Sequence, residues 1–242
     1  MNMRIGKYLF VALLLLLTSM HACKKDEDSP SSPETGIVAD IENNIYKTVK
    51  IGNRWWMAEN LRVKTFRDGT PIAYLPASDN WTNGIAAYCV FENNPESPGL
   101  LYNWHAVNHA AGIAPEGWHV PTDEDWQELE RELGMEAGEA AKKGWRGTHE
   151  GEKLKTVGTT DWSDYPNIWP TNESGFSALA GGCRLVDGTW GNPGLHATGF
   201  WWSSSERTNE DAWYRYLDYK NSKIFRSQCQ KAYGFNIRCV KD

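Results

Sequence analysis

The sequence predicts a sheet-rich domain that is closed on one side by an amphipathic helix. Residues 122–134 carry helix signals at both ends, whereas most of the remaining chain consists of short apolar runs separated by turn residues. The chain is also rich in aromatic residues and glycine, with 13 Trp, 10 Tyr and 22 Gly among 242 residues. This mixture is typical of irregular folds whose aromatic side chains both fill the core and reach the surface.

Residues 1–22 have the layout of a secretory signal peptide. Two basic residues start the segment, an apolar run covers 8–17, and small or polar residues precede Cys23. The apolar run is too short to span a membrane comfortably. Met-His-Ala-Cys at 20–23 resembles the cleavage box of bacterial lipoproteins, in which the cysteine receives lipid. We therefore expect lipid on Cys23, with an ordinary signal peptide as the alternative.

Residues 23–36 are predicted to form a disordered tether behind the lipidated cysteine. The stretch is polar, rich in Pro and Ser, and without periodicity. Its acidic run at 26–28 resembles the tag that directs lipoproteins to the outer surface of Bacteroidetes-type bacteria, although a generic solvated linker fits as well. We expect a lipid anchor in the outer membrane, facing the cell exterior.

The folded domain is predicted to extend over residues 37–242 and to begin with a three-stranded meander. Its strands are expected at 37–41, 45–51 and 54–58, because each intervening turn carries residues that tolerate positive φ. Polar and apolar residues alternate along the second strand, which predicts one buried and one wet face.

A long loop region at 62–98 follows, with one strand expected at 86–91. The segment 99–107 is predicted to start as a strand and to become a short helix, which places His105 and His109 one turn apart. Such a pair can bind zinc, but the sequence provides no third ligand nearby and no Glu between them. Packing or surface roles are therefore favoured, and no metal site is expected.

The helix at 122–134 has well-defined ends. Thr122 can cap its first free N–H groups, and the acids at 123–125 meet the positive end of the helix dipole. Apolar residues recur at i, i+3 and i+7 from Trp126, and Gly134 ends the helix. Capping explains the three acids better than a catalytic cluster, since consecutive side chains at a helix start point in different directions.

Further strands are predicted after the helix. A glycine-rich run at 175–185 is expected to form a sharply bent strand, and 220–223 is expected to be a turn between two strands. The remaining predicted strands are 199–204, 212–217, 224–226 and 234–240.

Several ordered motifs resemble the Fibrobacter succinogenes major paralogous domain. The resemblance extends from about residue 38 to the C-terminus, and it implies a secreted or surface lipoprotein. The motifs are Trp55-Trp56-Met57-Ala58-Glu59-Asn60-Leu61, Gly117-Trp118-His119-Val120-Pro121-Thr122, Glu173-Ser174-Gly175-Phe176, Trp202-Ser203-Ser204 and Gly234-Phe235 with Arg238-Cys239-Val240.

More distantly, residues 120–126 and 234–239 resemble the two end signatures of the formylglycine-generating-enzyme group, which has a C-type-lectin-like fold. That resemblance implies an α+β domain with twisted antiparallel sheets, one or two helices and long loops. The oxidase members of that group use two closely spaced cysteines, whereas Cys229 and Cys239 are ten positions apart here. The calcium motif by which many C-type lectins hold sugar is also absent.

Four cysteines remain after Cys23, and an even number in an exported domain favours disulfides. Four cysteines allow three connectivities. We expect Cys183 to pair with Cys229 and Cys89 with Cys239; free buried thiols are the alternative.

The strand at 212–217 carries aromatic residues on both of its faces, and one face needs a covering layer or a ligand. Exposed Tyr, Trp, Arg and Asn are typical of binding surfaces. The second possibility is that these aromatics only fill a large core. The predicted ligand contacts are Tyr214, Tyr216, Tyr219, Asn221 and Arg226, with Trp201 and Trp202 as support or core.

The composition and motifs favour recognition over catalysis. A net charge of −6 without a basic stripe excludes binding to a nucleic-acid backbone. No nucleophile with its base, metal triad or phosphate loop is present in the sequence. We expect a glycan or a surface protein as partner and no cofactor, with a structural calcium ion left open. The alternatives are an oxidase or metal-dependent enzyme that uses Cys229 or His105, and a purely structural module.

Overall fold

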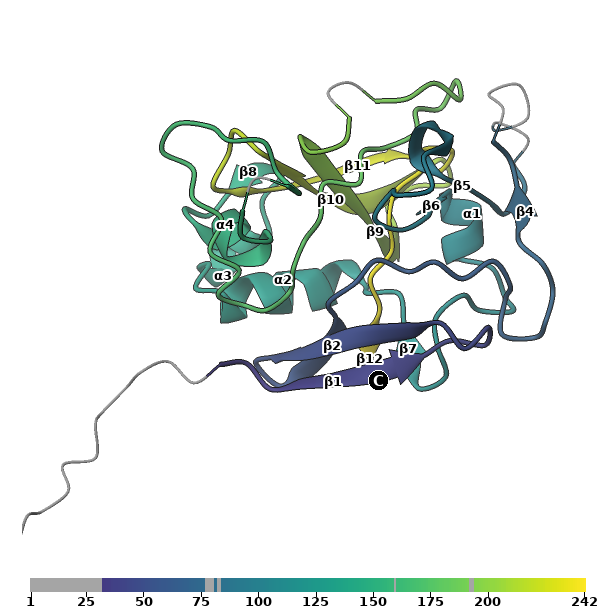
Figure 1. Ribbon diagram of the computed structural model, residues 1–242, viewed down its shortest axis with the longest axis horizontal. Coiled ribbons are helices and arrows are strands. Elements are labelled where there is room, and N and C mark those ends of the chain that lie inside the picture. The colour runs from purple at the N-terminus through teal and green to yellow at the C-terminus, as the bar shows by residue number, and fades with distance from the viewer. Residues whose placement is uncertain (1–31, 77–80, 82–83, 159, 192–193) are drawn as a thin grey trace, which may run out of the picture. The chain divides into compact units, whose positions relative to one another are not determined.

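In the computed structural model, mostly antiparallel sheets are combined with a few short helices between Pro33 and Asp242 (Figure 1). The predicted leader, Cys23 and most of the tether lie outside the described residues. In the described part of the chain, no helix has the length and apolar character needed to cross a bilayer. The residues described are 32–76, 81, 84–158, 160–191 and 194–242.

The first sheet has five strands and joins the two ends of the domain. The predicted meander is confirmed, although its first strand begins at Thr35, inside the expected tether. Its turns use positive φ at Asn43 and Gly52. The sheet runs in the order β1 (Thr35–Ala39), β2 (Ile45–Ile51), β3 (Arg54–Met57), β12 (Val240–Lys241) and β7 (Trp118–His119).

The prediction of one wet face for β2 is wrong. Tyr46 and Thr48 are buried on one face, while Val49 and Ile51 are buried on the other. The reason is that two separate core clusters meet this strand: Tyr46 belongs to one, and Val49 to the other.

The second sheet has four antiparallel strands, and α2 (Asp123–Glu132) packs on one of its faces. Residues of α2, of the first sheet and of the second sheet share one apolar cluster, so α2 lies between the two sheets (Figure 1). The strand order is β8 (Gly144–Arg146), β11 (Ile224–Gln230), β10 (Asp211–Asp218) and β9 (Thr198–Glu206).

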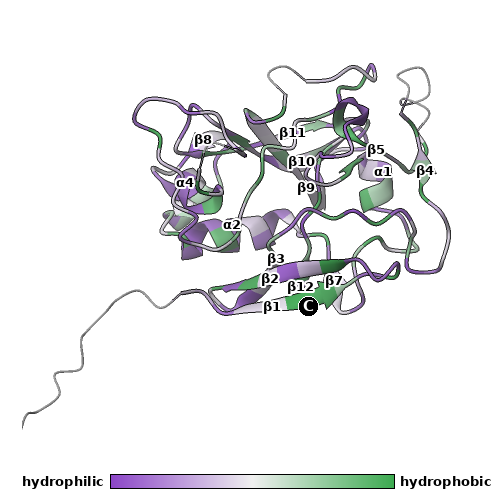
Figure 2. Cartoon of the chain, in the orientation of Figure 1, coloured by the Kyte–Doolittle hydropathy of each residue, from purple (hydrophilic) through white to green (hydrophobic). Residues whose placement is uncertain are grey.

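The ends of α2 are as predicted. Thr122 Oγ1 accepts a hydrogen bond from Asp125 N at 3.1 Å, and the Asp125 carboxylate accepts one from Thr122 N at 2.8 Å. This reciprocal capping box satisfies two free donors of the helix start. Gly134 follows with φ +107°, a conformation that suits glycine after a helix end. Figure 2 shows hydrophilic and hydrophobic residues on the same helix, consistent with its amphipathic sequence.

A third sheet and several short helices complete the domain. In this sheet β4 and β5 are parallel, unlike the other pairs. Its order is β4 (Ala73–Tyr74), β5 (Ala87–Cys89) and β6 (Leu101–Tyr102). The helices are η2 (Phe91–Asn93), α1 (Trp104–Val107), α3 (Ala137–Ala140) and α4 (Glu150–Leu154).

Two predicted strands are largely replaced by isolated bridges. In the 175–185 run, single bridges join Ala178 to Lys155 and Gly182 to Gly199. A Cβ atom at Gly182 would lie 2.3 Å from the Phe91 ring, so the glycine permits this close approach. Of the strand predicted at 234–240, only Val240 is in a regular strand, β12.

Candidate functional site

A fully buried polar node connects several of the sequence motifs. Asn60 Oδ1 accepts hydrogen bonds from Trp201 Nε1 at 3.0 Å and from Arg238 Nε at 2.9 Å. The Arg238 guanidinium also donates to the carbonyls of Phe176 and Ser177, and it lies over the Phe176 ring. Burial lowers the pKa of Arg238 to about 9. These motif residues therefore hold the interior together and are closed to a ligand.

A second buried network joins α2 to the neighbouring sheet. Asp123 accepts hydrogen bonds from Arg215 at 2.8 Å and from Arg226 at 2.6 and 2.9 Å. Glu130 accepts from Arg215 at 2.6 Å and from Arg146 at 2.6 and 2.8 Å. Burial alone would raise the pKa of Asp123, but Arg226 and Arg215 hold it below its usual value. This face of the sheet is closed by paired charges.

The opposite face of the same sheet carries a row of aromatic rings, one from each strand. In register, Trp145 of β8 pairs with Phe225 of β11, Phe225 with Tyr216 of β10, and Tyr216 with Phe200 of β9. The ring centroids of these successive neighbours are 5.2, 5.9 and 4.5 Å apart. All four side chains are half-buried. They form a continuous aromatic strip across the sheet.

Two more tyrosines extend this strip towards the buried Phe235. Tyr214 and Tyr233 are half-buried, and their ring centroids lie 5.1 and 5.6 Å from that of Phe235. We call the six half-buried rings the aromatic face: Trp145, Phe200, Tyr214, Tyr216, Phe225 and Tyr233.

The tyrosine hydroxyls of the aromatic face remain protonated at neutral pH. Burial raises the pKa of Tyr214, and burial together with the hydrogen bond to Asp218 raises that of Tyr216. The Tyr216 hydroxyl donates to Asp218 Oδ2, whereas the Tyr214 hydroxyl has no hydrogen-bond partner among the described residues. The face thus offers neutral donors beside apolar rings, which suits a hydroxylated, uncharged ligand.

The comparison with known families confirms the family that the sequence motifs resemble. The Fibrobacter succinogenes major domain matches residues 49–241, which is most of the chain. The chain belongs to this family. No curated protein and no solved structure matches the chain.

In this family member, the predicted ligand contacts are divided among three places. Tyr214 and Tyr216 lie on the aromatic face, as expected for side chains of one parity along β10. Tyr219 and Asn221 lie beyond the strand end: Tyr219 packs edge-on against Tyr165, and Asn221 Oδ1 accepts from Lys223 N within the turn. Lys155 stabilises the turn, because its Nζ donates to the Asp218 and Asn221 carbonyls at 2.6 and 2.7 Å.

The remaining predicted contacts are buried. Arg226 does not accompany the tyrosines, because it pairs in register with Arg215 and therefore points to the opposite face, where Asp123 binds it. Trp201 and Trp202 are 1% and 0% exposed, so their alternative role as core residues applies. Trp145, Phe200, Phe225 and Tyr233 were missed as site residues. Alternation within β9 and β11 could have indicated Phe200 and Phe225.

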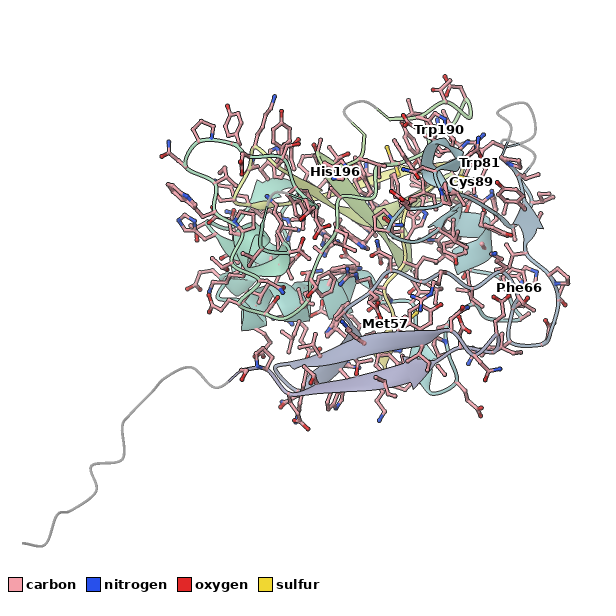
Figure 3. All side chains as sticks on the ribbon, in the orientation of Figure 1. Met57, Phe66, Trp81, Cys89, Trp190 and His196 are labelled. Carbon is pink, nitrogen blue, oxygen red and sulfur yellow. The ribbon has the colours of Figure 1, made fainter. Side chains whose placement is uncertain are left out.

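The predicted disulfides are absent. Cys89, Cys183, Cys229 and Cys239 are all free thiols in this structure. Cys89 lies in a cluster with Trp81, whereas Cys239 lies in another cluster, where its N–H contacts Met57 Sδ at 3.3 Å. Figure 3 shows Cys89 beside Trp81 and well separated from Met57.

Burial keeps two of the described thiols in the protonated form. Burial raises the pKa of Cys183 to about 12 and also raises that of Cys229, so both thiols remain protonated. The exposed His109 ring stacks on the Phe66 ring with a centroid distance of 4.0 Å, which fits its predicted packing or surface role. Within the described ranges, no three His, Cys, Asp or Glu side chains gather in a way that could hold a metal ion.

Proposed function

We propose that this chain is a surface-anchored lipoprotein whose C-type-lectin-like domain binds a glycan on its aromatic face. The observation that carries the proposal is the strip of half-buried rings from Trp145 to Phe200, one on each of four adjacent strands. Aromatic rings present large apolar areas at low conformational cost, and they are frequent anchors of binding surfaces. A segment of a surface protein is the second ligand class.

The dimensions and charge of the face favour an extended, neutral ligand. Strands lie roughly 4.8 Å apart, so a strip across four strands is about 14 Å long. The six residues of the aromatic face carry no charge, and the nearest arginines of the sheet point to the other side. Sugar rings have apolar faces that pack on aromatic rings and hydroxyls that can bond to Tyr214. A polyanionic ligand would find no counter-charge on this strip.

The ligand test is a glycan and surface-protein array probed with the purified full chain. The diagnostic variant is Tyr214→Ser with Tyr216→Ser, and the matched control is Trp169→Ala, which changes a ring that is 66% exposed and outside the aromatic face. We expect the double variant to lose the selected ligand while the control keeps it. Equal binding by all three proteins, with unchanged thermal melting, would exclude the aromatic face.

The anchoring part of the proposal has its own test. Metabolic labelling with a fatty acid is expected to mark the native chain and not the Cys23→Ala variant, because multiple acyl chains on the cysteine provide a stable anchor. Protease treatment of intact cells is expected to digest the domain if it faces the exterior. Equal labelling of both chains would contradict the lipid anchor.

A further inference from the structure

A groove of about 570 Å³ lies on a different part of the domain from the aromatic face. This volume falls within the roughly 300–1,000 Å³ that is usual for small-molecule sites. Four separate stretches line it: the β1–β2 turn, the segment after β3, the third sheet, and the loop before β6. The residues relevant to binding are Glu42, Arg62, Lys64, Tyr74, Tyr88 and Ser97.

Two cations on the segment after β3 face this groove without a carboxylate partner. In the described part of the chain, neither Arg62 nor Lys64 takes part in an ion pair. Arg62 is held in place, since its Nη2 donates to the Ile45 carbonyl at 2.6 Å and its guanidinium lies 4.4 Å from the Tyr46 ring centre. Lys64 is exposed. The groove therefore has one positive charge that is held by neighbouring groups, on Arg62, and one that is exposed, on Lys64.

The acidic residue of the groove offsets part of this positive charge, but among the described residues it forms no ion pair with either cation. Glu42 Oε1 accepts from Lys64 N at 3.0 Å and from Thr65 Oγ1 at 2.6 Å. Its other oxygen accepts from Asn44 Nδ2 at 3.3 Å. Because both Glu42 oxygens are bound to other donors of the chain, the charged ends of Arg62 and Lys64 remain available to an anion.

The groove also has an aromatic wall and an unpaired hydroxyl. Tyr74 is 47% exposed, and its ring centroid is 5.2 Å from that of the buried Tyr88. Neither tyrosine hydroxyl has a hydrogen-bond partner among the described residues. Ser97 also lines the groove, but its Oγ is enclosed and has no hydrogen-bond partner among the described residues. Tyr74 thus adds a stacking surface to the two cations.

We infer that this groove is a second binding site, specific for an acidic saccharide. The carboxylate would pair with Arg62 and Lys64, and the sugar ring would lie against Tyr74. This assignment goes beyond the proposed function, because it concerns another surface and a charged ligand. It holds whether or not the aromatic face binds a neutral glycan.

The test is calorimetric titration of the full chain with uronic-acid oligosaccharides, both galacturonate and glucuronate, and with the methyl ester of each. The ester keeps the sugar ring but removes the charge. Free acetate serves as a probe for the carboxylate alone. We expect the acid to bind at least about tenfold more tightly than its ester, because only the acid can form charge-assisted hydrogen bonds with Arg62 and Lys64. Rising salt should lower the affinity for the acid and leave the affinity for the ester unchanged.

Lys64→Gln is the diagnostic variant, since an exposed lysine can be replaced without disturbing the core. We expect it to weaken binding of the acid about tenfold, and Tyr74→Ser to weaken binding of both acid and ester. Lys241→Gln is the matched control: it removes an exposed positive charge at the C-terminal strand, away from the groove. The Tyr214→Ser and Tyr216→Ser double variant should bind the acid normally.

Four results would overturn the inference. One is an absence of binding by every uronate tested. Another is equal affinity for acid and ester in the native chain and in Lys64→Gln. The third is acetate binding as tightly as the oligosaccharide, which would reduce the site to a simple anion contact. Loss of acid binding in the Tyr214→Ser and Tyr216→Ser variant would move the site to the aromatic face.

Discussion

The two faces of the sheet β8-β11-β10-β9 differ in the kind of side chain they carry and in how far these side chains are buried. On the face towards α2, Arg215 and Arg226 are buried and share the carboxylate of Asp123. On the other face, Tyr214 and Tyr216 alternate with Arg215 along the same strand, yet they remain half-exposed. Buried charges need complete pairing, whereas apolar rings tolerate partial exposure. We therefore expect substitutions to cost more stability on the face towards α2, and we propose that the ligand binds on the other face.

The largest expected loss of stability is at Asp123. Asp123→Asn removes the charge that Arg215 and Arg226 share, and it leaves two buried guanidiniums without that partner. We expect the free energy of unfolding to fall by about 3–5 kcal/mol, measured by urea denaturation. Glu124→Gln is the control. The Glu124 side chain is 70% exposed, so its carboxylate should contribute less than about 1 kcal/mol to stability. Similar losses in the two variants would refute the buried network.

A smaller loss is expected at the buried node of Asn60. Asn60→Ala leaves Trp201 Nε1 and Arg238 Nε without their shared acceptor. We expect the variant to unfold with about 2–3 kcal/mol less free energy than the native chain. Asn53→Ala, in the exposed β2–β3 turn, should change it by less than about 0.5 kcal/mol. An Asn60 variant as stable as the Asn53 control would contradict the structural role of the node.

The aromatic face should show the reverse balance between stability and binding. Tyr214→Ser removes a half-exposed ring, so we expect a loss of stability of about 1–2 kcal/mol in thermal unfolding. Affinity for the array-selected ligand should fall at least about tenfold. Tyr216→Phe keeps the ring and removes only the hydroxyl that bonds to Asp218, so it should retain most of the affinity. Equal binding by native and Tyr214→Ser chains would separate recognition from this face.

The smallest expected effect is a pH dependence at His119, beside the α2 start. Hydrogen bonds to Asp125 and Asp242 raise the pKa of His119 above its usual value of 6.5. Its stabilising contribution is therefore complete below pH 6.5 and is lost as the pH rises through the folded-state pKa. Because the side chain is 35% exposed, we expect less than about 1 kcal/mol between pH 5.5 and 8.

The His119→Gln variant tests this contribution by urea denaturation at both pH values. It should lose less stability than the native chain as the pH rises. An identical change in the two proteins would show that His119 does not titrate against its acidic neighbours.

Local signals in the sequence were sufficient for α2 and for the main strands. Thr122 and Gly134 define a helix by capping, and the turns around Asn43 and Gly52 define the first meander. β8 escaped prediction because a three-residue strand is stabilised mainly by its pairing with β11, about 80 positions later. The same applies to the bridges that replace the 175–185 strand.

The candidate site could be predicted only in part. Alternation along β10 correctly placed Tyr214 and Tyr216 on one face. Arg226 was assigned to them because the register that opposes it to Arg215 depends on long-range pairing. The groove lined by Arg62, Tyr74 and Ser97 had no sequence signature, since these residues come from separate loops and strands.

Hydroxyl-radical footprinting of the full chain, with and without the array-selected glycan, tests the central claim most directly. If the aromatic face binds the ligand, oxidation of Tyr214, Tyr216 and Phe225 should decrease at saturation. Trp169 and Tyr165, which are 66% and 43% exposed outside this face, should react as before. Protection confined to Trp169, Tyr165 or any other surface, with Tyr214 and Tyr216 unchanged, would contradict the account.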